Sequence, residues 1–334
     1  MPPDSSLPEK SSTASMRPRT DTKIPVVVIF APTACGKTAL IEKTFGKGGL
    51  AVFKDRAEII SADSQSVYRG MNIGTAKPSA CEMEQIPYHL VNIADPAEQF
   101  GAGEFIEYAD RACKDIYSRS KIPVLAGGTG FYIRNFLLGL PVTPASDPAI
   151  RQSLKQRLES AGSQSLYAEL TIADPVSAKR INPHDNYRIL RALEVYYTCG
   201  RPLSSFALPS EPRKQYDFLT IILTRPREEL FSRIDERVEK MFSEGLEEEV
   251  QSLVKKGYGT DSPGMKAIGY SEFFIPGLNT AQIKERIKLD SRHYAKKQYT
   301  FMRGIPGAKT FSADDEEAIQ SELKLFFRSA AKAE

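Results

Sequence analysis

The residues best suited to chemistry form a phosphate-binding pattern near the start of the chain. An aliphatic run over residues 24–30 ends in a turn of small residues, and a Lys-Thr pair then opens an amphipathic segment. Backbone N–H groups at such a turn point at an anion, the lysine adds positive charge, and the threonine hydroxyl can ligate Mg²⁺. We therefore expect a phosphate-bearing ligand, with Mg²⁺ on Thr38, at Ala31, Pro32, Thr33, Ala34, Cys35, Gly36, Lys37 and Thr38.

Two residues of this turn need separate comment. Ala31 stands where the pattern usually has glycine. Alanine is tolerated there if its φ is negative, whereas a positive φ would cost about 1 kcal/mol or more. Cys35 is either a reactive thiol, if the site lowers its pKa, or a small residue that fills a tight turn.

Two further polar residues follow predicted strands. Asp63 comes after the apolar run at 57–61, and Thr129 lies in a Gly-Gly-Thr-Gly turn after the run at 122–126. Ligands of parallel sheets bind beyond the carboxyl ends of the strands, so we expect both residues to share one crevice with the phosphate turn. Asp63 is then a general base, a Mg²⁺ ligand or a helix cap, and Thr129 is a substrate contact or a helix N-cap.

Composition excludes several classes of protein. The chain has 334 residues, 41% hydrophobic and 26% charged, with a net charge of +3, which is ordinary for a globular protein. Its four cysteines form no C-x-x-C pair, which argues against a disulfide framework or a zinc site and fits the cytoplasm. No apolar segment approaches the ~18 residues of a membrane span. Residues 1–22 are rich in Ser, Thr and Pro, and we expect them to be a disordered leader.

The elements that must position these residues alternate between strands and helices. Predicted strands at 24–30, 57–61, 89–93, 122–126 and 218–223 are separated by helical spacing, as at 104–117, 130–138 and 227–242. This alternation predicts an α/β fold, a P-loop NTPase-like parallel sheet with helices on both faces. We expect the catalytic core to comprise residues 23–140 and 205–312, followed by a tail or helix at 313–334.

Residues 141–204 differ, because helices at 148–161, 165–170 and 187–197 follow one another without a strand. We expect an all-helical insertion there. It is rich in Lys and Arg, and so is a long predicted helix at 280–303. Charge on one helix is usually a solvated face, but two basic helical surfaces beside a phosphate site favour a polyanionic partner.

Several segments together resemble one family. They are Asp63-Ser64-Gln65-Ser66-Val67-Tyr68-Arg69-Gly70-Met71, Ile73-Gly74-Thr75-Ala76-Lys77-Pro78, Gly127-Gly128-Thr129-Gly130-Phe131-Tyr132, Arg188-Ile189-Leu190-Arg191-Ala192-Leu193-Glu194, Arg233-Ile234-Asp235-Glu236-Arg237-Val238 and Met265-Lys266-Ala267-Ile268-Gly269-Tyr270. In this order the chain resembles the tRNA dimethylallyltransferases of bacterial type over residues 24–312. The resemblance implies transfer of a dimethylallyl group from dimethylallyl diphosphate to the N6 amine of the adenine 3′ to the anticodon, with Mg²⁺ as cofactor. Ala31, Ser271 and Phe301 depart from the family pattern.

The resemblance also implies roles for residues. Asp63 would be the general base, Arg237 a clamp on the diphosphate with Arg233 beside it, and Thr129 a contact to substrate. The anticodon stem-loop of a tRNA would be the partner of a monomeric cytoplasmic enzyme. Its expected contacts are Asp63, Ser64, Gln65, Ser66, Thr129, Arg151, Tyr187, Arg188, Ile189, Leu190, Arg191, Lys266, Gly269 and Tyr270.

Two other functions compete with this interpretation. A P-loop kinase of nucleoside or shikimate type, binding ATP, would share the core and Asp63 but would not need the basic insertion. A nucleotide-gated RNA-binding protein would keep the basic surfaces and could dispense with Asp63.

Overall fold

The computed structural model describes residues 23–332, so the expected leader at 1–22 lies outside the described residues. Its centre is a six-stranded parallel sheet, which confirms the predicted fold class. The strand order is β3 (Tyr88–His89), β2 (Ala57–Ala62), β4 (Ile122–Gly127), β1 (Ile24–Phe30), β5 (Tyr216–Thr224) and β6 (Lys309–Ser312).

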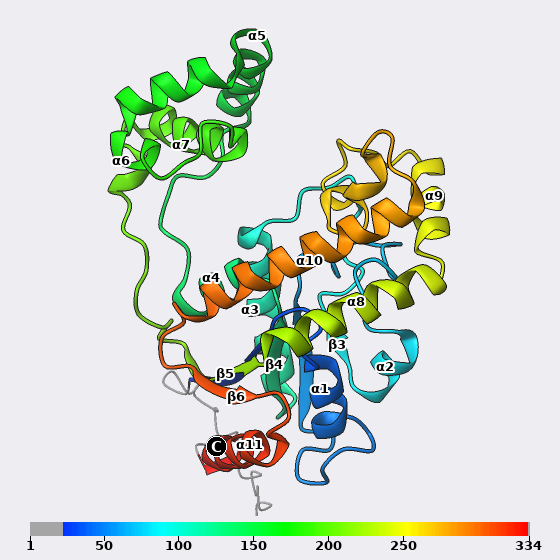
Figure 1. Cartoon of the computed structure of the whole chain (residues 1–334). Coiled ribbons are helices and arrows are strands. Elements are labelled where there is room, and N and C mark those ends of the chain that lie inside the picture. The colour runs from blue at the N-terminus through cyan, green and yellow to red at the C-terminus, as the bar shows by residue number, and fades with distance from the viewer. Residues whose placement is uncertain (1–22, 333–334) are drawn as a thin grey trace, which may run out of the picture.

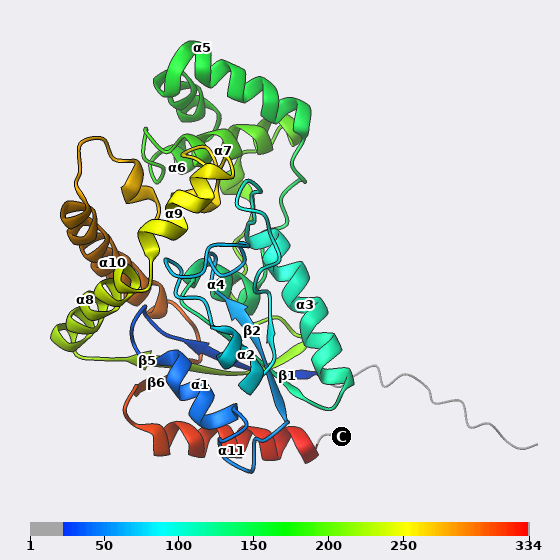
Figure 2. The same cartoon turned by 90° about the vertical axis from the view of Figure 1, so that its right-hand side faces the viewer.

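Helices cover both faces of this sheet (Figures 1 and 2). One face packs against α1 (Lys37–Phe45), α8 (Arg227–Ser243) and α11 (Glu316–Lys332), and the other against α3 (Ala102–Ser118) and α4 (Gly130–Leu138). The central strands β1, β2 and β4 are therefore covered on both faces, which explains why they are continuous apolar runs.

A third group of elements extends beyond the carboxyl edge of the sheet. It contains α9 (Leu246–Lys255), the short helices η2 (Gly264–Lys266) and η3 (Ser271–Phe274), and the first half of α10 (Thr280–Met302). These elements pack against the end of α8 and the chain around residues 67–71. They build a wall above the strand ends, and α2 (Ala80–Gln85) lies at the side of α1 (Figure 1).

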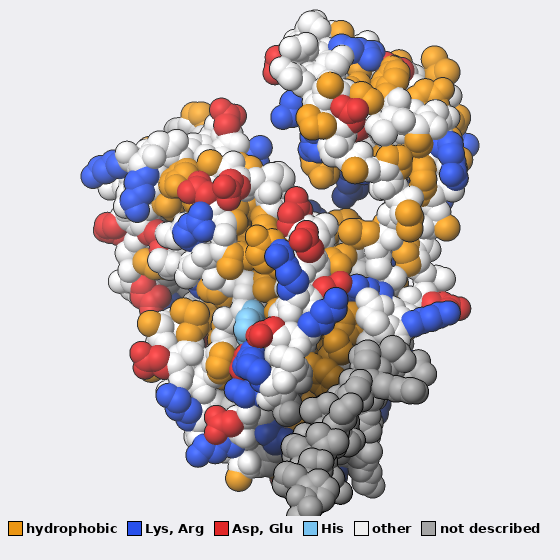
Figure 3. Space-filling view, turned by 180° about the vertical axis from the view of Figure 1, so that it is seen from behind, with side chains coloured by type: hydrophobic (Ala, Val, Ile, Leu, Met, Phe, Trp, Pro, Cys, Tyr) orange, Lys and Arg blue, Asp and Glu red, His pale blue; other side chains and the backbone are white. Residues whose placement is uncertain are grey.

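The segment expected to be a helical insertion forms α5 (Pro148–Ala173), α6 (Pro175–Ala178), α7 (Asn186–Cys199) and η1 (Leu203–Ser205). These helices share an apolar core of their own, centred on Leu166, Leu170 and Leu193. They stand apart from the sheet as a lobe on two connecting segments (Figures 1 and 3). The label α5 covers two helices, as predicted at 148–161 and 165–170, and they meet at Gly162, whose φ of 76° is not helical.

One predicted boundary was wrong for an identifiable reason. The strand predicted at 89–93 is only Tyr88–His89, because Leu90 and Asn92 take left-handed conformations with φ of 63° and 57°. Of the two alternatives for the segment from residue 313, a tail or a helix, the structure has the helix. This helix, α11, buries Phe327 against Phe45 and Phe53 under the sheet.

No helix within residues 23–332 combines the length and the apolar character needed to cross a membrane.

Candidate active site

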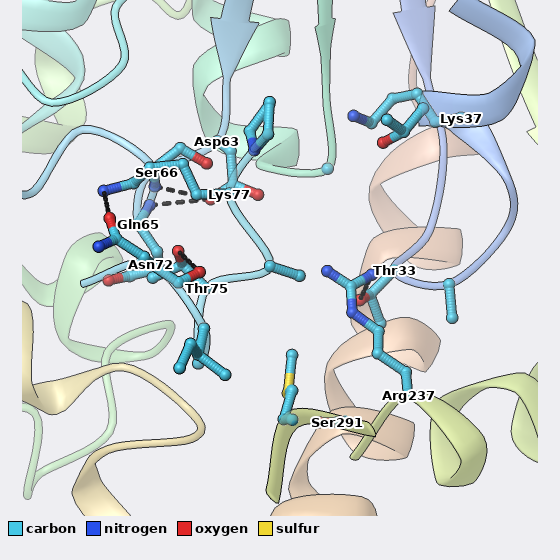
Figure 4. Close-up of a pocket in the computed structure, with 18 of the residues that line it drawn as sticks. Thr33, Lys37, Asp63, Gln65, Ser66, Asn72, Thr75, Lys77, Arg237 and Ser291 are labelled. Atoms are coloured by element: carbon cyan, nitrogen blue, oxygen red, sulfur yellow. Dashed lines mark hydrogen bonds between the residues drawn. The ribbon is translucent and has the colours of Figure 1, made fainter. Parts of the chain in front are cut away.

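A cavity of about 1390 Å³ opens at the carboxyl edge of the sheet. Its walls come from the loops that follow β1 and β2, from residues 72–83, and from one side each of α8 and α10. All eight residues of the predicted phosphate turn line it, and so do Asp63, Ser64, Gln65, Ser66, Arg233, Arg237 and Lys266. The strand topology therefore brings together most of the residues that were expected to share a crevice (Figure 4). Thr129, which was also expected there, is not among the lining residues and reaches the cavity wall through its hydrogen bonds to Ser64.

The phosphate turn presents backbone donors to this cavity. Gly36 takes a left-handed φ of 106° as the N-cap of α1, and Ala34 has a φ of 60°. Ala31 is not among the residues with positive φ, so the missing glycine costs nothing there. Within residues 23–332, the N–H groups of Gly36, Lys37 and Thr38 have no protein acceptor, as expected at a helix N-terminus that holds an anion.

Side chains from distant parts of the chain hold the turn in place. Gln298 of α10 is buried; its Oε1 accepts from the Thr33 N–H at 3.0 Å, and its Nε2 donates to the Gly128 carbonyl at 2.7 Å. Arg233 Nε donates to the Ala34 carbonyl at 2.9 Å, and Arg225 Nε to the Cys35 carbonyl at 2.7 Å. Sequence reasoning missed Gln298 and Arg225, since neither belongs to a recognisable local pattern.

Three charged groups face one another inside the cavity. Burial lowers the pKa of Lys37, and the Arg237 charge lowers it further, while Asp63 opposes both effects. Burial also lowers the pKa of Arg237, and Asp63 again opposes the change. Arg237 donates to the Thr33 hydroxyl at 3.4 Å, so it reaches the phosphate turn (Figure 4). Lys37 and Arg237 are two partly desolvated cations that face one carboxylate, Asp63, and this arrangement favours a bound anion.

Of the two expected roles of Cys35, a reactive thiol or a small residue that fills a tight turn, the structure favours the second. Cys35 is buried in the apolar core, and burial raises the pKa of its thiol to about 11. A thiol with so high a pKa is a weak nucleophile, so Cys35 is a packing residue.

Asp63 directly follows β2, and one of its carboxylate oxygens accepts hydrogen bonds from the turn that comes next. Its Oδ1 accepts from the N–H of Gln65 at 2.8 Å and of Ser66 at 3.4 Å. Within residues 23–332 no protein donor reaches Oδ2, so this oxygen is available to a ligand in the cavity. The turn fixes the carboxylate while leaving one of its oxygens able to accept a proton.

Thr129 connects the ends of β2 and β4. Its hydroxyl accepts from the Ser64 N–H at 2.9 Å and donates to Ser64 Oγ at 3.2 Å. Thr129 occupies the N-cap position of α4, but its side chain makes no capping hydrogen bond. Tyr294 of α10 lies beside it and lines the cavity; its hydroxyl donates to the Gly128 carbonyl at 3.4 Å. Burial and the Asp63 charge raise the pKa of Tyr294 to about 12, so this group stays a neutral donor.

The donor set in the cavity fits Mg²⁺ bound together with a diphosphate. Thr38 offers one hydroxyl to the cation from the start of α1. No group of three His, Cys, Asp or Glu side chains within residues 23–332 makes a dedicated metal site. Mg²⁺ in phosphate enzymes usually takes one or two protein ligands and completes its shell with phosphate oxygens and water, so this sparse set suffices.

The expected tRNA contacts on the helical lobe fall into two groups. Tyr187 and Arg188 are exposed at the start of α7, and the Arg151 guanidinium lies 5.8 Å from the Tyr187 ring. Ile189 is buried and Leu190 packs against the same core, so their side chains support this surface from within. Arg191 donates to the Pro144 carbonyl at 2.9 Å and to Glu194 at 3.1 Å, and so it fastens the connecting segment to α7.

The expected contacts after residue 265 are similarly divided. Lys266 is exposed and lines the cavity. The Tyr270 side chain is fully buried, and its hydroxyl donates to Glu249 at 2.6 Å. Gly269 has a φ of 96° and packs on Gly74 so tightly that a Cβ would lie 3.1 Å from the Gly74 carbonyl oxygen. Tyr270 and Gly269 therefore shape the wall that presents Lys266.

The basic helix α10 carries less free charge than its sequence suggested. Lys284 and Lys288 pair with Glu239, Arg286 pairs with Asp290, and Arg292 with Asp235. Most of this helix is therefore a neutralised, ion-paired face, whereas its cavity side presents Ser291, Tyr294 and Gln298. Among the described residues, the basic side chains of α10 without an ion pair lie near its last turns, at Lys296, Lys297 and Arg303, so the surface expected for a polyanion is smaller than the sequence indicated.

A phosphate loop, an aspartate and an arginine facing one large cavity define a P-loop group-transfer enzyme whose cavity has room for a second ligand. Residues 66–305 match the family model described as IPP transferase. The chain belongs to this IPP transferase (tRNA dimethylallyltransferase) family, as its sequence motifs predicted.

Related proteins agree over nearly the whole chain. The chain is 42% identical to "tRNA dimethylallyltransferase 1" of Trichlorobacter lovleyi, covering 93% of this chain and all of the relative. The crystal structure of the tRNA isopentenylpyrophosphate transferase of Bacillus halodurans matches with a TM-score of 0.65 at 32% identity, over 93% of this chain and 99% of that one. A eukaryotic dimethylallyltransferase described as acting on tRNA matches with a TM-score of 0.70 at 26% identity, over 93% of this chain and 78% of that one.

Proposed function

We propose that this protein transfers the dimethylallyl group of dimethylallyl diphosphate to the exocyclic N6 amine of the adenine 3′ to the anticodon in tRNA, and releases diphosphate. The observation that carries the proposal is the pairing of an anion-binding loop with a free carboxylate oxygen across one cavity of about 1390 Å³. Such a cavity holds an organic diphosphate and a purine together.

The first requirement of the reaction is to stabilise a departing diphosphate. As the bond between the allylic carbon and the diphosphate oxygen breaks, negative charge grows on the diphosphate. Lys37, Arg237 and the N–H groups of Gly36 and Thr38 surround the position where this charge develops. Fixed donors aimed at developing charge are usually the largest single contribution to catalysis. Arg237 adds a planar fork that suits phosphate oxygens.

The second requirement is to remove a proton from the attacking amine. A bond forms between the adenine nitrogen and the allylic carbon, and the nitrogen must lose a proton to become neutral again. The free Oδ2 of Asp63 takes that proton in our proposal, while its Oδ1 keeps the carboxylate oriented. Diphosphate leaves with the electron pair of the broken carbon–oxygen bond, so atoms and charges balance.

Mg²⁺, held by Thr38 and the diphosphate, would add charge neutralisation at the leaving group. We regard Asp63 as a base rather than a metal ligand because its fixed position faces the rest of the cavity as well as the phosphate loop.

The third requirement is access to the adenine. Enzymes that act on a base extrude it from its stack, and RNA loops present bases that are easily extruded. Gln65 lines the cavity, and its buried Oε1 has no hydrogen-bond partner in the described part of the chain. An extruded base would satisfy that acceptor, and Thr129 lies next to it through Ser64. Arg151, Tyr187, Arg188 and Lys266 would hold the stem-loop in the cytoplasm, where tRNA is modified.

An assay with two labels tests this function against the kinase alternative. Purified protein is incubated with Mg²⁺, an anticodon stem-loop RNA and either labelled dimethylallyl diphosphate or ATP labelled in its γ-phosphate. We expect label from the prenyl donor in the RNA, and no transfer after chelation of Mg²⁺. Label passing from ATP to a small acceptor, with none from the prenyl donor, would establish a kinase instead. RNA binding without any transfer would favour the nucleotide-gated binding protein.

A further inference from the structure

Arg225 follows the end of β5 and lies directly behind the phosphate loop. Only 8% of its side chain is exposed, and it is not among the residues that line the cavity. Its Nε donates to the Cys35 carbonyl at 2.7 Å. A Cβ placed on Gly36 would lie 3.5 Å from an Arg225 guanidinium nitrogen, which shows how closely the side chain approaches the loop.

This contact determines the direction of one backbone donor. In a planar trans peptide the C=O and N–H groups point in opposite directions. Because Arg225 holds the Cys35 carbonyl from behind, the N–H of Gly36, which belongs to the same peptide unit, is directed away from Arg225. Gly36 lines the cavity, and within the described chain its N–H has no protein acceptor. That N–H therefore points toward the cavity, where the proposed diphosphate would lie.

A residue of the C-terminal segment keeps Arg225 in place. Asp314 accepts from both guanidinium nitrogens, at 2.9 and 2.7 Å, and Glu229 accepts from one of them. This bidentate geometry is the strong form of the Arg–carboxylate pair. The Tyr299 hydroxyl contacts the Arg225 backbone N–H and carbonyl at 3.2 Å each. Asp314 follows β6, is 66% exposed and is not among the residues that line the cavity.

We propose that Arg225 and Asp314 form a positioning pair that aims the Gly36 N–H at the diphosphate, and that the segment after β6 thereby contributes to donor binding. This inference deepens the proposed function, since it assigns residues that act on the same diphosphate without contacting it. It also gives the start of the C-terminal segment a role beyond covering the sheet.

Inorganic pyrophosphate is the probe, because its binding is measured without any transfer reaction. Calorimetry with Mg²⁺ compares the wild type with Asp314→Asn, Arg225→Lys and Arg225→Met. We expect the Kd for pyrophosphate to rise about tenfold in Arg225→Met and severalfold in Asp314→Asn, with Arg225→Lys between the wild type and Arg225→Met. The Kd for stem-loop RNA should stay unchanged. Glu322→Gln is the matched control, because its pair with Lys309 joins β6 to α11 without touching the loop.

Kinetics give a second, independent measurement. The variants should raise KM for dimethylallyl diphosphate and lower kcat, whereas KM for RNA should stay unchanged. In the double variant, the effects of Arg225→Met and Asp314→Asn should be non-additive, because both substitutions remove the same contact. Normal pyrophosphate binding in Asp314→Asn and Arg225→Lys, with only a lower Tm, would overturn the proposal even if Arg225→Met fails to fold. A wild type that binds pyrophosphate but transfers no prenyl group would contradict the proposed function and leave this test intact.

Discussion

At the scale of single residues, the site combines a local pattern with contacts that no local pattern contains. The phosphate turn was predictable because its donors and its lysine lie within eight consecutive residues. Gln298 was not, because it meets Thr33 across 265 positions of the chain, and Arg225 meets Cys35 across 190. A spacing pattern cannot reveal such partners until the sheet order and the path of α10 are known.

Asp63→Asn tests the proton acceptor at this scale. Asparagine keeps an oxygen for the Gln65 N–H, so the turn survives while the acceptor of the proton is lost. We expect the single-turnover transfer rate to fall by about 10²–10⁴-fold, with the Kd for stem-loop RNA within a factor of about two. Asp115→Asn, on the exposed side of α3, is the control and should transfer at the wild-type rate. A normal rate together with weakened RNA binding would remove Asp63 from the base role.

At the scale of elements, the strands that bear the site were predictable because both of their faces are buried. The runs at β1, β2 and β4 are apolar throughout apart from Glu58 and Ser61. The edge strands were harder to predict from the sequence. The strand β3 is only two residues long, and β6 was missed because most of its residues are exposed. Edge strands lack the continuous apolar signal, since only part of their surface is covered.

Glu58 joins three elements at the opposite end of β2 from the site. It is buried and accepts from His89 Nε2 at 2.8 Å, Lys121 Nζ at 2.9 Å and the Arg119 guanidinium. Burial alone would raise the pKa of Glu58, but these hydrogen bonds outweigh it and lower the pKa to about 2. Because the folded-state pKa lies below its ordinary value, the ionised carboxylate stabilises the fold above about pH 4.5. That stabilisation is lost as the pH falls toward 2.

Glu58→Gln should therefore destabilise the protein by about 3 kcal/mol at neutral pH, because a neutral amide cannot replace the buried carboxylate in its ion pairs with the partly exposed Arg119 and Lys121. The difference in unfolding free energy from the wild type should shrink between pH 4.5 and 2. Chemical denaturation across this pH range measures both effects. Asp115→Asn removes a more exposed partner of Arg119 and should cost less than about 1 kcal/mol. A difference that is independent of pH would contradict the assignment.

At the scale of the whole molecule, the helical lobe stands apart from the sheet on two connecting segments (Figures 1 and 3). Arg191 and Glu194 fasten one of these segments to α7, because Arg191 donates to the Pro144 carbonyl and Glu194 accepts from the Ser146 hydroxyl. The sequence indicated the lobe through its lack of strands and its basic residues. It could not indicate which charges remain free, because ion pairs such as Arg157–Glu169 depend on helices that pack together only in the fold.

Arg188→Ala tests whether the lobe binds the RNA. The Arg188 side chain is 67% exposed and has one ion pair, to Asp185 at 3.3 Å, whereas Arg157 is held by both Glu169 and Tyr197. Losing one phosphate contact should weaken stem-loop binding several-fold and reduce the slope of log K against log salt by about 0.7–1. Arg157→Ala is the matched control and should change the slope less. Equal effects of the two variants, or none from Arg188→Ala, would place the RNA elsewhere.

The most direct test of the central claim is a crystal structure of the protein with stem-loop RNA and a non-hydrolysable thio analogue of dimethylallyl diphosphate. We expect the diphosphate on the turn at 31–38, and the adenine N6 about 3–3.5 Å from the allylic carbon with Asp63 beside it, the distance of a reactive complex. An adenine that stays stacked outside the cavity, or a donor bound away from Lys37 and Arg237, would contradict the account.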